Sequence, residues 1–377
     1  MAGIVSQKMH FEIDNQCPTK KQGAKMNLLK STLELIEKPS QPVMDKAQAR
    51  LDNLTKPLGS LGRLEELAKK ISGIMGTERP RISQKTIIVA AADHGVAKEG
   101  VSAFPQEVTP QMVLNFLSGG AGINVLARHI GANVLVVDAG VASDIAPHTA
   151  LLNKKIAYGT KNMATGPAMS MDEAVKTVEA GIETAEAAIK GGASIIGTGD
   201  MGIGNTTASS AITAVITGQK PEDVTGRGTG IDDKSLANKV EVIKKAIKAN
   251  SPDKNNALDI LSKVGGFEIG FLCGVILACA ANKKPVVIDG FISGAAALLA
   301  YVFKPETSDY MIASHCSVEK GHIVALKHMG LKPILDLDLR LGEGTGAALG
   351  ISIAEAGVKI LNEMATFAQA GVSEKNK

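Results

Sequence analysis

The sequence predicts an α/β protein, a Rossmann-like arrangement in which a mostly parallel sheet carries helices on both faces. Two observations predict the parallel sheet. Short apolar runs rich in β-branched residues recur along the chain, and longer amphipathic or alanine-rich segments separate them. In such sheets ligands bind at the carboxyl ends of the strands. The residues that follow each predicted strand are therefore the first candidates for a functional site.

Six strands are expected, in chain order at residues 85–91, 133–138, 193–197, 285–289, 310–313 and 333–339. Helices are expected between and after them, among others at 171–190, 234–249 and 350–368. The helix at 171–190 follows Ser170 and begins with Asp172 and Glu173, and the helix at 234–249 follows Asp232 and Asp233. Serine and aspartate are favoured N-cap residues, and acids in the first turn complement the helix dipole.

The order of segments predicts four parts of the chain. Residues 1–25 are polar and read as a flexible extension without the apolar stretch of a signal peptide. Residues 26–80 are expected to be a helical segment of a small domain, 81–346 a large α/β catalytic domain, and 347–377 the C-terminal helices that complete the small domain. The stretches 28–75 and 347–370 read as helical throughout, so the two ends of the chain are expected to pack together.

Composition excludes several classes of protein. The 377 residues carry a net charge of only +3, which gives no reason to expect nucleic acid or an anionic membrane as a partner. The longest apolar run, at 269–281, is too short and too broken by glycine to span a bilayer. Four cysteines make no disulfide framework in a chain of this length, and Cys273 and Cys279 lie in an apolar helical run. We expect a cytoplasmic protein.

A polar pair, Asp93-His94, follows the first predicted strand and precedes Gly95. An aspartate and a histidine at this position are typical of an active site. No further histidine or carboxylate follows at metal-ligand spacing, so an orienting hydrogen bond is favoured over a metal site.

A glycine-rich segment follows the third predicted strand and leads into a helix. It reads Gly197-Thr198-Gly199-Asp200-Met201-Gly202-Ile203-Gly204-Asn205-Thr206-Thr207. Glycines let backbone N–H groups approach an anion, and a helix N-terminus adds partial positive charge, so the segment predicts a phosphate site. The alternative is a tight turn without a ligand. The spacing also fits a dinucleotide motif, but the nearest acids, Glu222 and Asp223, lie in a turn rather than at the end of the next strand, which argues against a dehydrogenase.

Further candidates follow the later strands. Gly226-Arg227-Gly228-Thr229-Gly230 leads into the helix that bears Lys239, and Ser314-His315-Cys316-Ser317 follows the fifth predicted strand. Glu343 lies between Gly342 and Gly344 where a helix begins, a costly choice of backbone unless something must come close. We favour a catalytic carboxylate over a surface turn. Asp336 and Asp338 alternate along the sixth predicted strand and are read as one face of an edge strand rather than as metal ligands.

These segments, in this order, resemble the nicotinate-nucleotide:dimethylbenzimidazole phosphoribosyltransferase family, whose members make the lower-ligand nucleotide of cobamides. The resemblance runs from Leu51-Asp52-Asn53-Leu54-Thr55-Lys56-Pro57-Leu58-Gly59-Ser60-Leu61-Gly62 to about residue 368. It includes Ala92-Asp93-His94-Gly95-Val96, Gly199-Asp200-Met201-Gly202-Ile203-Gly204-Asn205-Thr206-Thr207, Lys263-Val264-Gly265-Gly266-Phe267, Val287-Ile288-Asp289-Gly290-Phe291 and Arg340-Leu341-Gly342-Glu343-Gly344. The family implies a Rossmann-like sheet, a small helical domain, a dimer and no metal. Nicotinate mononucleotide is a substrate, so no cofactor is implied.

The resemblance also implies roles for single residues. Glu343 matches the general base, and Asp200, which stands where a longer glutamate is usual, matches an auxiliary carboxylate. The residues that match the donor site are Gly202, Ile203, Gly204, Asn205, Lys239, Asp289, Ser317 and Gly342. The pyridinium nitrogen of the donor leaves as neutral nicotinate, so one carboxylate suffices, whereas glycoside hydrolysis needs an acid and a base.

Three departures from the family pattern concern the acceptor. Phe104 stands where benzimidazole-using relatives carry a small hydroxyl residue, Met112 stands for a glutamine, and Met201 stands for a leucine. The site thus becomes tighter and less polar, which favours phenol or p-cresol. Family members that use phenols form heterodimers with a paralogous chain. Neutral drift at the three positions is the alternative, with a benzimidazole or purine as acceptor. A catalytically silent partner subunit is a third hypothesis, against which the presence of Glu343 argues.

Overall fold

The structure is a computed structural model that describes residues 26–373. The extension predicted for 1–25 and the last four residues lie outside the described residues. The strands are β1 (Lys85–Ala92), β2 (Ala132–Gly140), β3 (Leu151–Asn153), β4 (Ile195–Met201), β5 (Val286–Ile288) and β6 (Met311–Ala313). They form one sheet of order β3-β2-β1-β4-β5-β6, and every pair of neighbours is parallel.

The helices follow the strands in the alternation that the sequence predicts. They are α1 (Met26–Glu34), α2 (Gln41–Asp52), α3 (Arg63–Met75), α4 (Val108–Leu117), α5 (Gly122–Ile130), α6 (Met171–Lys190), α7 (Asn205–Thr217), α8 (Pro221–Val224), α9 (Asp233–Asn250), α10 (Ala257–Val264), α11 (Phe267–Ala281), α12 (Phe291–Phe303), α13 (Lys320–His328), α14 (Thr345–Glu363) and α15 (Phe367–Ala370), with 3₁₀ turns η1 (Gly95–Glu99) and η2 (Pro305–Tyr310). The α/β fold with a parallel sheet is therefore confirmed.

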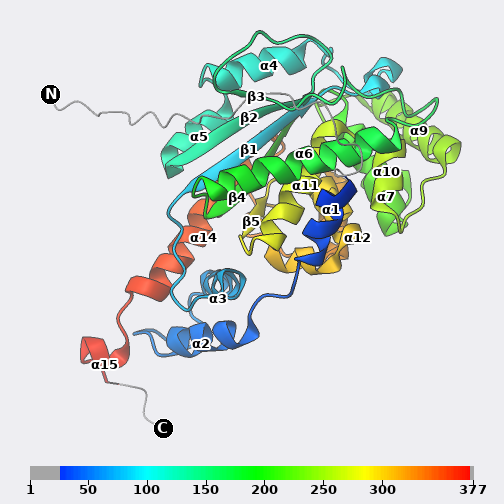
Figure 1. The fold of residues 1–377 in the computed structure, drawn as a ribbon. Helices are drawn as coiled ribbons and strands as arrows, with labels where there is room; N and C mark the ends of the chain where they lie inside the picture. Colours follow the sequence, from blue (N-terminus) through cyan, green and yellow to red (C-terminus); the bar gives the residue numbers. More distant parts are fainter. Residues whose placement is uncertain (1–25, 374–377) are drawn as a thin grey trace.

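Side chains of the central strand alternate between two apolar layers. Ile88, Ala90 and Ala92 of β1 pack with α6, α11 and α12, whereas Ile87 and Val89 pack with α4, α5 and α14. Figure 1 shows α6 and α11 lying along one side of the sheet. Both faces are covered, and this burial explains why β1 reads as a continuous apolar run rather than as an alternating strand.

Two of the predicted strands need correction. Residues 333–339 form no strand, because only one parallel bridge, between His315 and Leu335, continues the sheet beyond β6. Pro333 lacks a backbone N–H, and Asp338 has a φ of 54°, which no strand tolerates. Asp336 and Asp338 therefore do not lie on an edge strand. A short strand that the sequence did not reveal, β3, pairs with β2 instead.

The strand predicted at 193–197 continues to Met201, so Gly197 and Gly199 belong to β4 and not to a loop. A Cβ on Gly199 would clash with the backbone oxygen of Glu343, and one on Gly197 would lie 3.2 Å from the Cβ of Ala347. These two glycines thus let α14 and the segment before it approach the sheet. The part of the glycine-rich segment that connects β4 to α7 is the turn at 202–205, which we call the donor turn after the substrate that the sequence predicts there.

The two ends of the chain do meet. Nε of Arg50 in α2 donates to the backbone oxygen of Leu361 at 2.6 Å, and an isolated antiparallel bridge joins Leu54 to Thr366. Ala68 and Leu361 belong to a separate apolar cluster of α2, α3 and α14. Neither end is helical throughout, since the chain breaks its helices at 35–40, 53–62 and 364–366. The domain boundaries stay a prediction, and two facts bear on them: α1 packs on α6 and α11, and α14 crosses the boundary placed at 346.

Within residues 26–373, no helix combines the length and the apolar character that crossing a membrane requires.

Candidate active site

The sheet has a switch point between β1 and β4. The chain leaves β1 toward β2 on one side and leaves β4 toward β5 on the other side. In open sheets of this kind, ligands bind in the crevice outside the carboxyl ends of the strands at that point. Asp93 and His94 follow β1, and Gly202 follows β4. The structure therefore brings two of the predicted segments together at the expected place.

The donor turn is held tightly against the end of β1. A Cβ on Gly202 would clash with the backbone oxygen of Ala92, and one on Gly204 would lie 3.2 Å from the Cβ of His94. Gly204 also has a φ of 95°, which side chains rarely adopt. The N–H of Ile203 donates to Oγ1 of Thr109 at 3.2 Å. Packing and backbone conformation thus require both glycines, whether or not the predicted phosphate binds here. The N–H of Ile203 already donates within the protein.

Lys239 is buried beneath the loop at 226–230. Its Nζ donates to Oγ1 of Thr206 at 2.7 Å and to the backbone oxygen of Gly226 at 3.4 Å. Burial lowers the pKa of Lys239 to about 8, and the charge of Glu319 opposes that shift. Oε1 of Glu319 accepts from the N–H of Gly228 at 2.8 Å. A buried ammonium at the first turn of α7 is suited to an anionic group, which would compensate its charge.

Asp200 is the last buried residue of β4, and its carboxylate faces the segment before α14. Oδ2 accepts from Nδ2 of Asn205 at 3.0 Å, so this amide is occupied by the protein. A Cβ on Gly342 would lie 3.4 Å from both carboxylate oxygens. Among the described residues, Oδ1 has no hydrogen-bond partner. Burial raises the pKa of Asp200 well above its usual value, and the charges of Asp289, Glu268 and Glu343 add to this rise.

Glu343 adopts a left-handed backbone with a φ of 63°, between Gly342 and Gly344, whose φ values are 81° and 93°. A non-glycine residue in this region is strained, and such strain clusters at functional sites. The side chain is only 5% exposed. Its Oε2 accepts from the N–H of Ile123 at 3.1 Å, at the start of α5. Burial raises the pKa of Glu343, and hydrogen bonds from Ile123 and Gly122 oppose the rise.

Asp289 holds the backbone of the segment that carries Glu343. Its Oδ2 accepts from the N–H of Gly344 at 3.2 Å, and its Oδ1 accepts from the N–H of Ala347 at 2.9 Å. The side chain thus caps the N-terminus of α14, and burial raises its pKa to about 7. The structure places Asp289 where its carboxylate orients a candidate catalytic residue, whereas the sequence suggested contact with the donor.

Ser317 lies beyond β6 and is oriented by a buried histidine. The N–H of Ser317 donates to Nδ1 of His322 at 3.1 Å. Burial lowers the pKa of His322 to about 3 and that of His315 to about 4. Both imidazoles are therefore neutral at physiological pH and act as hydrogen-bonding groups. The hydroxyl of Ser317 accepts from the N–H of Glu319 at 3.4 Å. Ser317 is thereby connected to the loop above Lys239, which Glu319 also contacts.

The three candidate acceptor residues come from different elements. Phe104 lies in the segment 101–107, which we call the acceptor loop after the substrate that the sequence predicts for it, and the residue is 52% exposed. Met112 in α4 and Met201 at the end of β4 are half-buried and pack against the same apolar cluster. Met112 and Met201 thus pack on one apolar cluster, whereas Phe104 is exposed to solvent.

Asp93 and His94 do not pair with each other. Oδ2 of Asp93 accepts from the N–H of Ala142 at 2.8 Å, and Nε2 of His94 lies 2.5 Å from Oε1 of Glu268. In the described part of the chain, no group of three or more His, Cys, Asp and Glu side chains is arranged to hold a metal. That the reaction needs no metal or cofactor stays a prediction.

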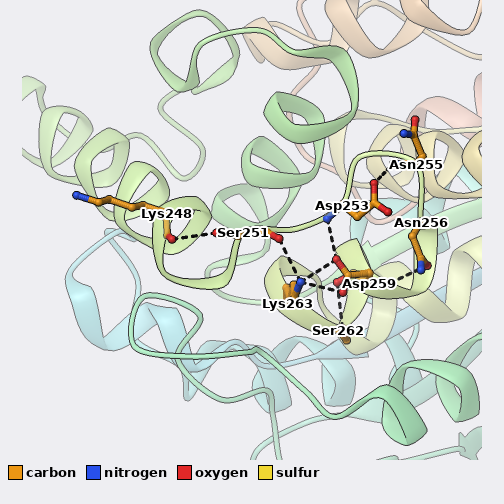
Figure 2. A network of polar contacts seen from close by, with 8 residues as sticks. All are labelled: Lys248, Ser251, Asp253, Asn255, Asn256, Asp259, Ser262 and Lys263. Atoms are coloured by element: carbon orange, nitrogen blue, oxygen red, sulfur yellow. Dashed lines mark hydrogen bonds and ion pairs between the residues drawn. The ribbon is translucent and has the colours of Figure 1, made fainter.

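Lys263, the first residue of its motif, has a structural role in the connection between α9 and α10. Figure 2 shows Nζ of Lys263 between the backbone oxygen of Ser251, at 3.1 Å, and the carboxylate of Asp259, at 2.9 Å. Oδ1 of Asn256 accepts from the N–H of Asp259 at 3.1 Å and caps α10. Lys263 thus fixes the connection between α9 and α10, and Gly265-Gly266 leads from there into α11.

Sequence reasoning missed two residues of this site, Glu319 and Glu268. Glu319 contacts the loop above Lys239, and no pattern in the sequence marks it. Thr206, which contacts Lys239, lies in the glycine-rich segment that the sequence singled out, but no role of its own was predicted for it. Glu268 faces the underside of the donor turn, since its Oε1 would lie 3.2 Å from a Cβ on Gly202. A signal for Glu268 did exist, because it is the single charged residue in the otherwise apolar helix α11.

Comparison with known proteins agrees with this geometry. Residues 36–372 match a family model described as phosphoribosyltransferase. Nicotinate-nucleotide–dimethylbenzimidazole phosphoribosyltransferase of Chloroflexus aggregans is 58% identical over 352 residues, which cover 93% of this chain and 100% of the relative. The enzyme of that name from Desulforudis audaxviator is 58% identical over 349 residues, covering 93% and 99%. A crystal structure of the Thermus thermophilus enzyme superposes with a TM-score of 0.85 at 44% identity, covering 89% of this chain and 100% of that one.

Proposed function

The chain belongs to the nicotinate-nucleotide–dimethylbenzimidazole phosphoribosyltransferase family, and from that premise we propose that it transfers the phosphoribosyl group of nicotinate mononucleotide to phenol or p-cresol. Its family membership shows that it is a phosphoribosyltransferase, related to enzymes named for dimethylbenzimidazole. The products are nicotinate and an α-ribotide that serves as the lower-ligand precursor of a cobamide.

One observation carries the reaction type. Glu343 presents a buried carboxylate whose Oε2 accepts from the N–H of Ile123, while Asp289 accepts from the N–H of Gly344 next to it. A general base must be held in one position and must have a pKa near the operating pH. The two hydrogen bonds support the first condition, and burial raises the pKa of Glu343, which moves it in the direction that the second condition requires.

The chemistry balances with a single proton acceptor. The acceptor hydroxyl forms a bond to C1′ of the ribose as the bond between C1′ and the pyridinium nitrogen breaks. The electron pair of that bond stays on nitrogen, so nicotinate leaves with a neutral ring and needs no proton. The hydroxyl proton goes to Glu343. Attack opposite to the leaving group converts the β-nucleotide into an α-riboside.

The donor phosphate is assigned to the donor turn and to Lys239. The helix α7 begins directly after the donor turn, and its N-terminus carries partial positive charge. Lys239 reaches the same first turn through Thr206. A phosphate at this point would lie on the switch point of the sheet, beside the carboxylates of Asp200 and Glu343.

A phenol is preferred over a benzimidazole because of Phe104, Met112 and Met201. An apolar ring packs well on methionine and phenylalanine side chains. A benzimidazole brings a second nitrogen, and leaving it unpaired costs about 1–3 kcal/mol. Dimethylbenzimidazole remains the second candidate, since the relatives are named for it.

We further propose a cytoplasmic dimer, with a paralogous chain as the second subunit of a heterodimer. The experiment uses the purified full-length chain, alone and with any such paralogue, supplied with nicotinate mononucleotide and a panel of phenols and benzimidazoles. An O-glycoside from phenol or p-cresol supports the proposal, and N-glycosides alone would refute the phenolic acceptor. If Glu343→Gln in the reconstituted pair leaves turnover unchanged, the chain is a silent subunit.

A further inference from the structure

We propose that His94 and Glu268 form a positioning pair that fixes the donor turn relative to the acceptor loop. The inference rests on the proposed function, because it takes the donor turn and the acceptor loop as the two substrate-binding segments. Neither residue is expected to touch a reacting atom. Their role is to hold the two segments at a fixed separation at the carboxyl end of β1.

The backbone of His94 holds the acceptor loop. Nε2 of Gln106 donates to the backbone oxygen of His94 at 2.9 Å. Gln106 lies two residues from Phe104 in the acceptor loop and is half-buried. His94 directly follows β1 and Asp93, so the loop that carries Phe104 is attached to the most central part of the sheet.

The side chain of His94 supports the donor turn. Its Cβ lies 3.2 Å from the position that a Cβ on Gly204 would take. The imidazole is 1% exposed, and its Nε2 lies 2.5 Å from Oε1 of Glu268. The ring therefore has one fixed orientation, with the donor turn on one side and α11 on the other. A Cβ on Gly266 would clash with this ring, so the N-cap of α11 must be small for the pair to form.

Glu268, in α11, also lies next to the donor turn. Its carboxylate is fully buried, and Oε1 lies 3.2 Å from the position of a Cβ on Gly202. Among the described residues, Oε2 has no hydrogen-bond partner. A buried carboxylate with one unpaired oxygen costs stability. A charged residue that lowers stability inside an otherwise apolar helix is typical of a functional site rather than of core packing.

The test separates the two substrates. Glu268→Ala and His94→Ala should each raise the KM for nicotinate mononucleotide about tenfold, the effect of losing a hydrogen bond to a charged group, with a much smaller change in the acceptor KM. The double variant should be no worse than either single variant, because the two changes remove the same contact. Gln106→Met should raise the acceptor KM severalfold and leave the donor KM unchanged.

Conservative variants distinguish positioning from general destabilisation. Glu268→Gln keeps an oxygen that can accept from His94, so its donor KM should stay within about threefold of wild type. Glu355→Gln is the matched control, because Glu355 pairs with Lys85 at 2.7 Å at the opposite end of β1. It should lower stability without changing either KM.

Several results would overturn the proposal. Glu268→Ala with an unchanged donor KM and a lower melting temperature would make the pair merely structural, and so would Glu268→Gln behaving as Glu268→Ala. If His94→Ala fails to fold, Gln106→Met decides, and an unchanged acceptor KM would refute the link to the acceptor loop. These outcomes presuppose wild-type turnover of nicotinate mononucleotide. Its absence would refute the proposed function instead.

Discussion

The backbone N–H of Ile123 donates a 3.1 Å hydrogen bond to Oε2 of Glu343, which joins the start of α5 to the segment before α14. The N-terminus of α5 contributes partial positive charge, so it stabilises the ionised form of a carboxylate that burial would otherwise protonate. One oxygen of Glu343 is thereby fixed, and a proton can be taken up at the other. The strained left-handed backbone of Glu343 is consistent with a side chain placed for chemistry.

Glu343→Gln should lower kcat by a factor of about 10²–10⁴, the usual effect of removing a general base. Binding of nicotinate mononucleotide, measured by calorimetry, should survive, because Gln keeps an oxygen that accepts from Ile123. Burial raises the pKa of Glu343 above 4.5. The base works only when deprotonated, so kcat of the wild type should fall as pH falls through that raised pKa. A variant with nearly full kcat would remove Glu343 from this role.

Donor binding should take up protons in the alkaline range. Burial lowers the pKa of Lys239 from 10.5 to about 8, so the Lys239 amine of the free enzyme is mostly deprotonated between those two pH values. A bound phosphate would raise the pKa of Lys239 again and draw a proton from the buffer. Calorimetry at one pH in this window, in buffers of different ionisation enthalpy, measures the uptake.

Lys70 provides the matched control for that experiment. Its pKa is also lowered to about 8 by burial, but its Nζ donates to the backbone oxygens of Ser308 and Met311. Lys70→Met should keep the proton uptake, whereas Lys239→Met should lose it and weaken donor binding. Equal uptake by both variants would place the phosphate elsewhere.

The parallel sheet was predictable because its strands are buried on both faces. Ile87, Ile88 and Val89 make β1 a continuous apolar run that no surface strand would show. The edges were not predictable in the same way. β3 has three residues and a half-buried surface, so nothing in its composition marks a strand. The segment at 333–339 has the apolar alternation of a strand, but Pro333 and the left-handed Asp338 limit its pairing to the one bridge between His315 and Leu335.

The site was predictable where backbone geometry demands an unusual residue order. Glu343 between two glycines is such a case, and the structure shows the left-handed backbone that requires the neighbouring glycines. Residues whose role depends on tertiary contact left no local trace. Glu319 meets Gly228, in the loop above Lys239, from 91 positions along the chain, and Asp289, which directly follows β5, caps α14 from 58 positions away.

Asp200→Asn should make the folded state more stable than that of wild type, and the difference should grow as pH rises. The pKa of Asp200 is raised well above 3.8 in the folded state, mainly by burial. The folded state therefore holds a proton that the unfolded state loses, and wild-type stability falls as pH rises from 3.8 through the folded pKa. Asparagine does not titrate, so the melting temperature of the variant should exceed that of wild type increasingly toward alkaline pH. Activity should decrease in the variant if Asp200 is the auxiliary carboxylate.

A pH-independent difference in melting temperature would contradict this account of Asp200. Asp259→Asn serves as the comparison, because Asp259 pairs with Lys263 and its pKa is lowered. A lowered carboxylate pKa stabilises the fold above the unfolded pKa, so Asp259→Asn should destabilise the fold at neutral pH. The two substitutions thus change stability in opposite directions.

The acceptor preference should depend on two side chains, Phe104 in the acceptor loop and Met112 in α4. In the proposed reaction, a phenol would offer one hydroxyl to Glu343 and an apolar ring to Phe104, Met112 and Met201. Phe104→Ser with Met112→Gln supplies a hydroxyl and an amide in their place, which can pair with the second nitrogen of a benzimidazole. Pairing that atom is worth about 1–3 kcal/mol, or roughly tenfold to a hundredfold in the ratio of kcat/KM for benzimidazole to that for phenol. Competition between the two acceptors, with O- and N-glycosides separated and quantified, measures the ratio directly. Phe104 is 52% exposed and Met112 half-buried, so the double variant should fold as wild type does. A ratio that stays unchanged would show that these two positions do not select the acceptor.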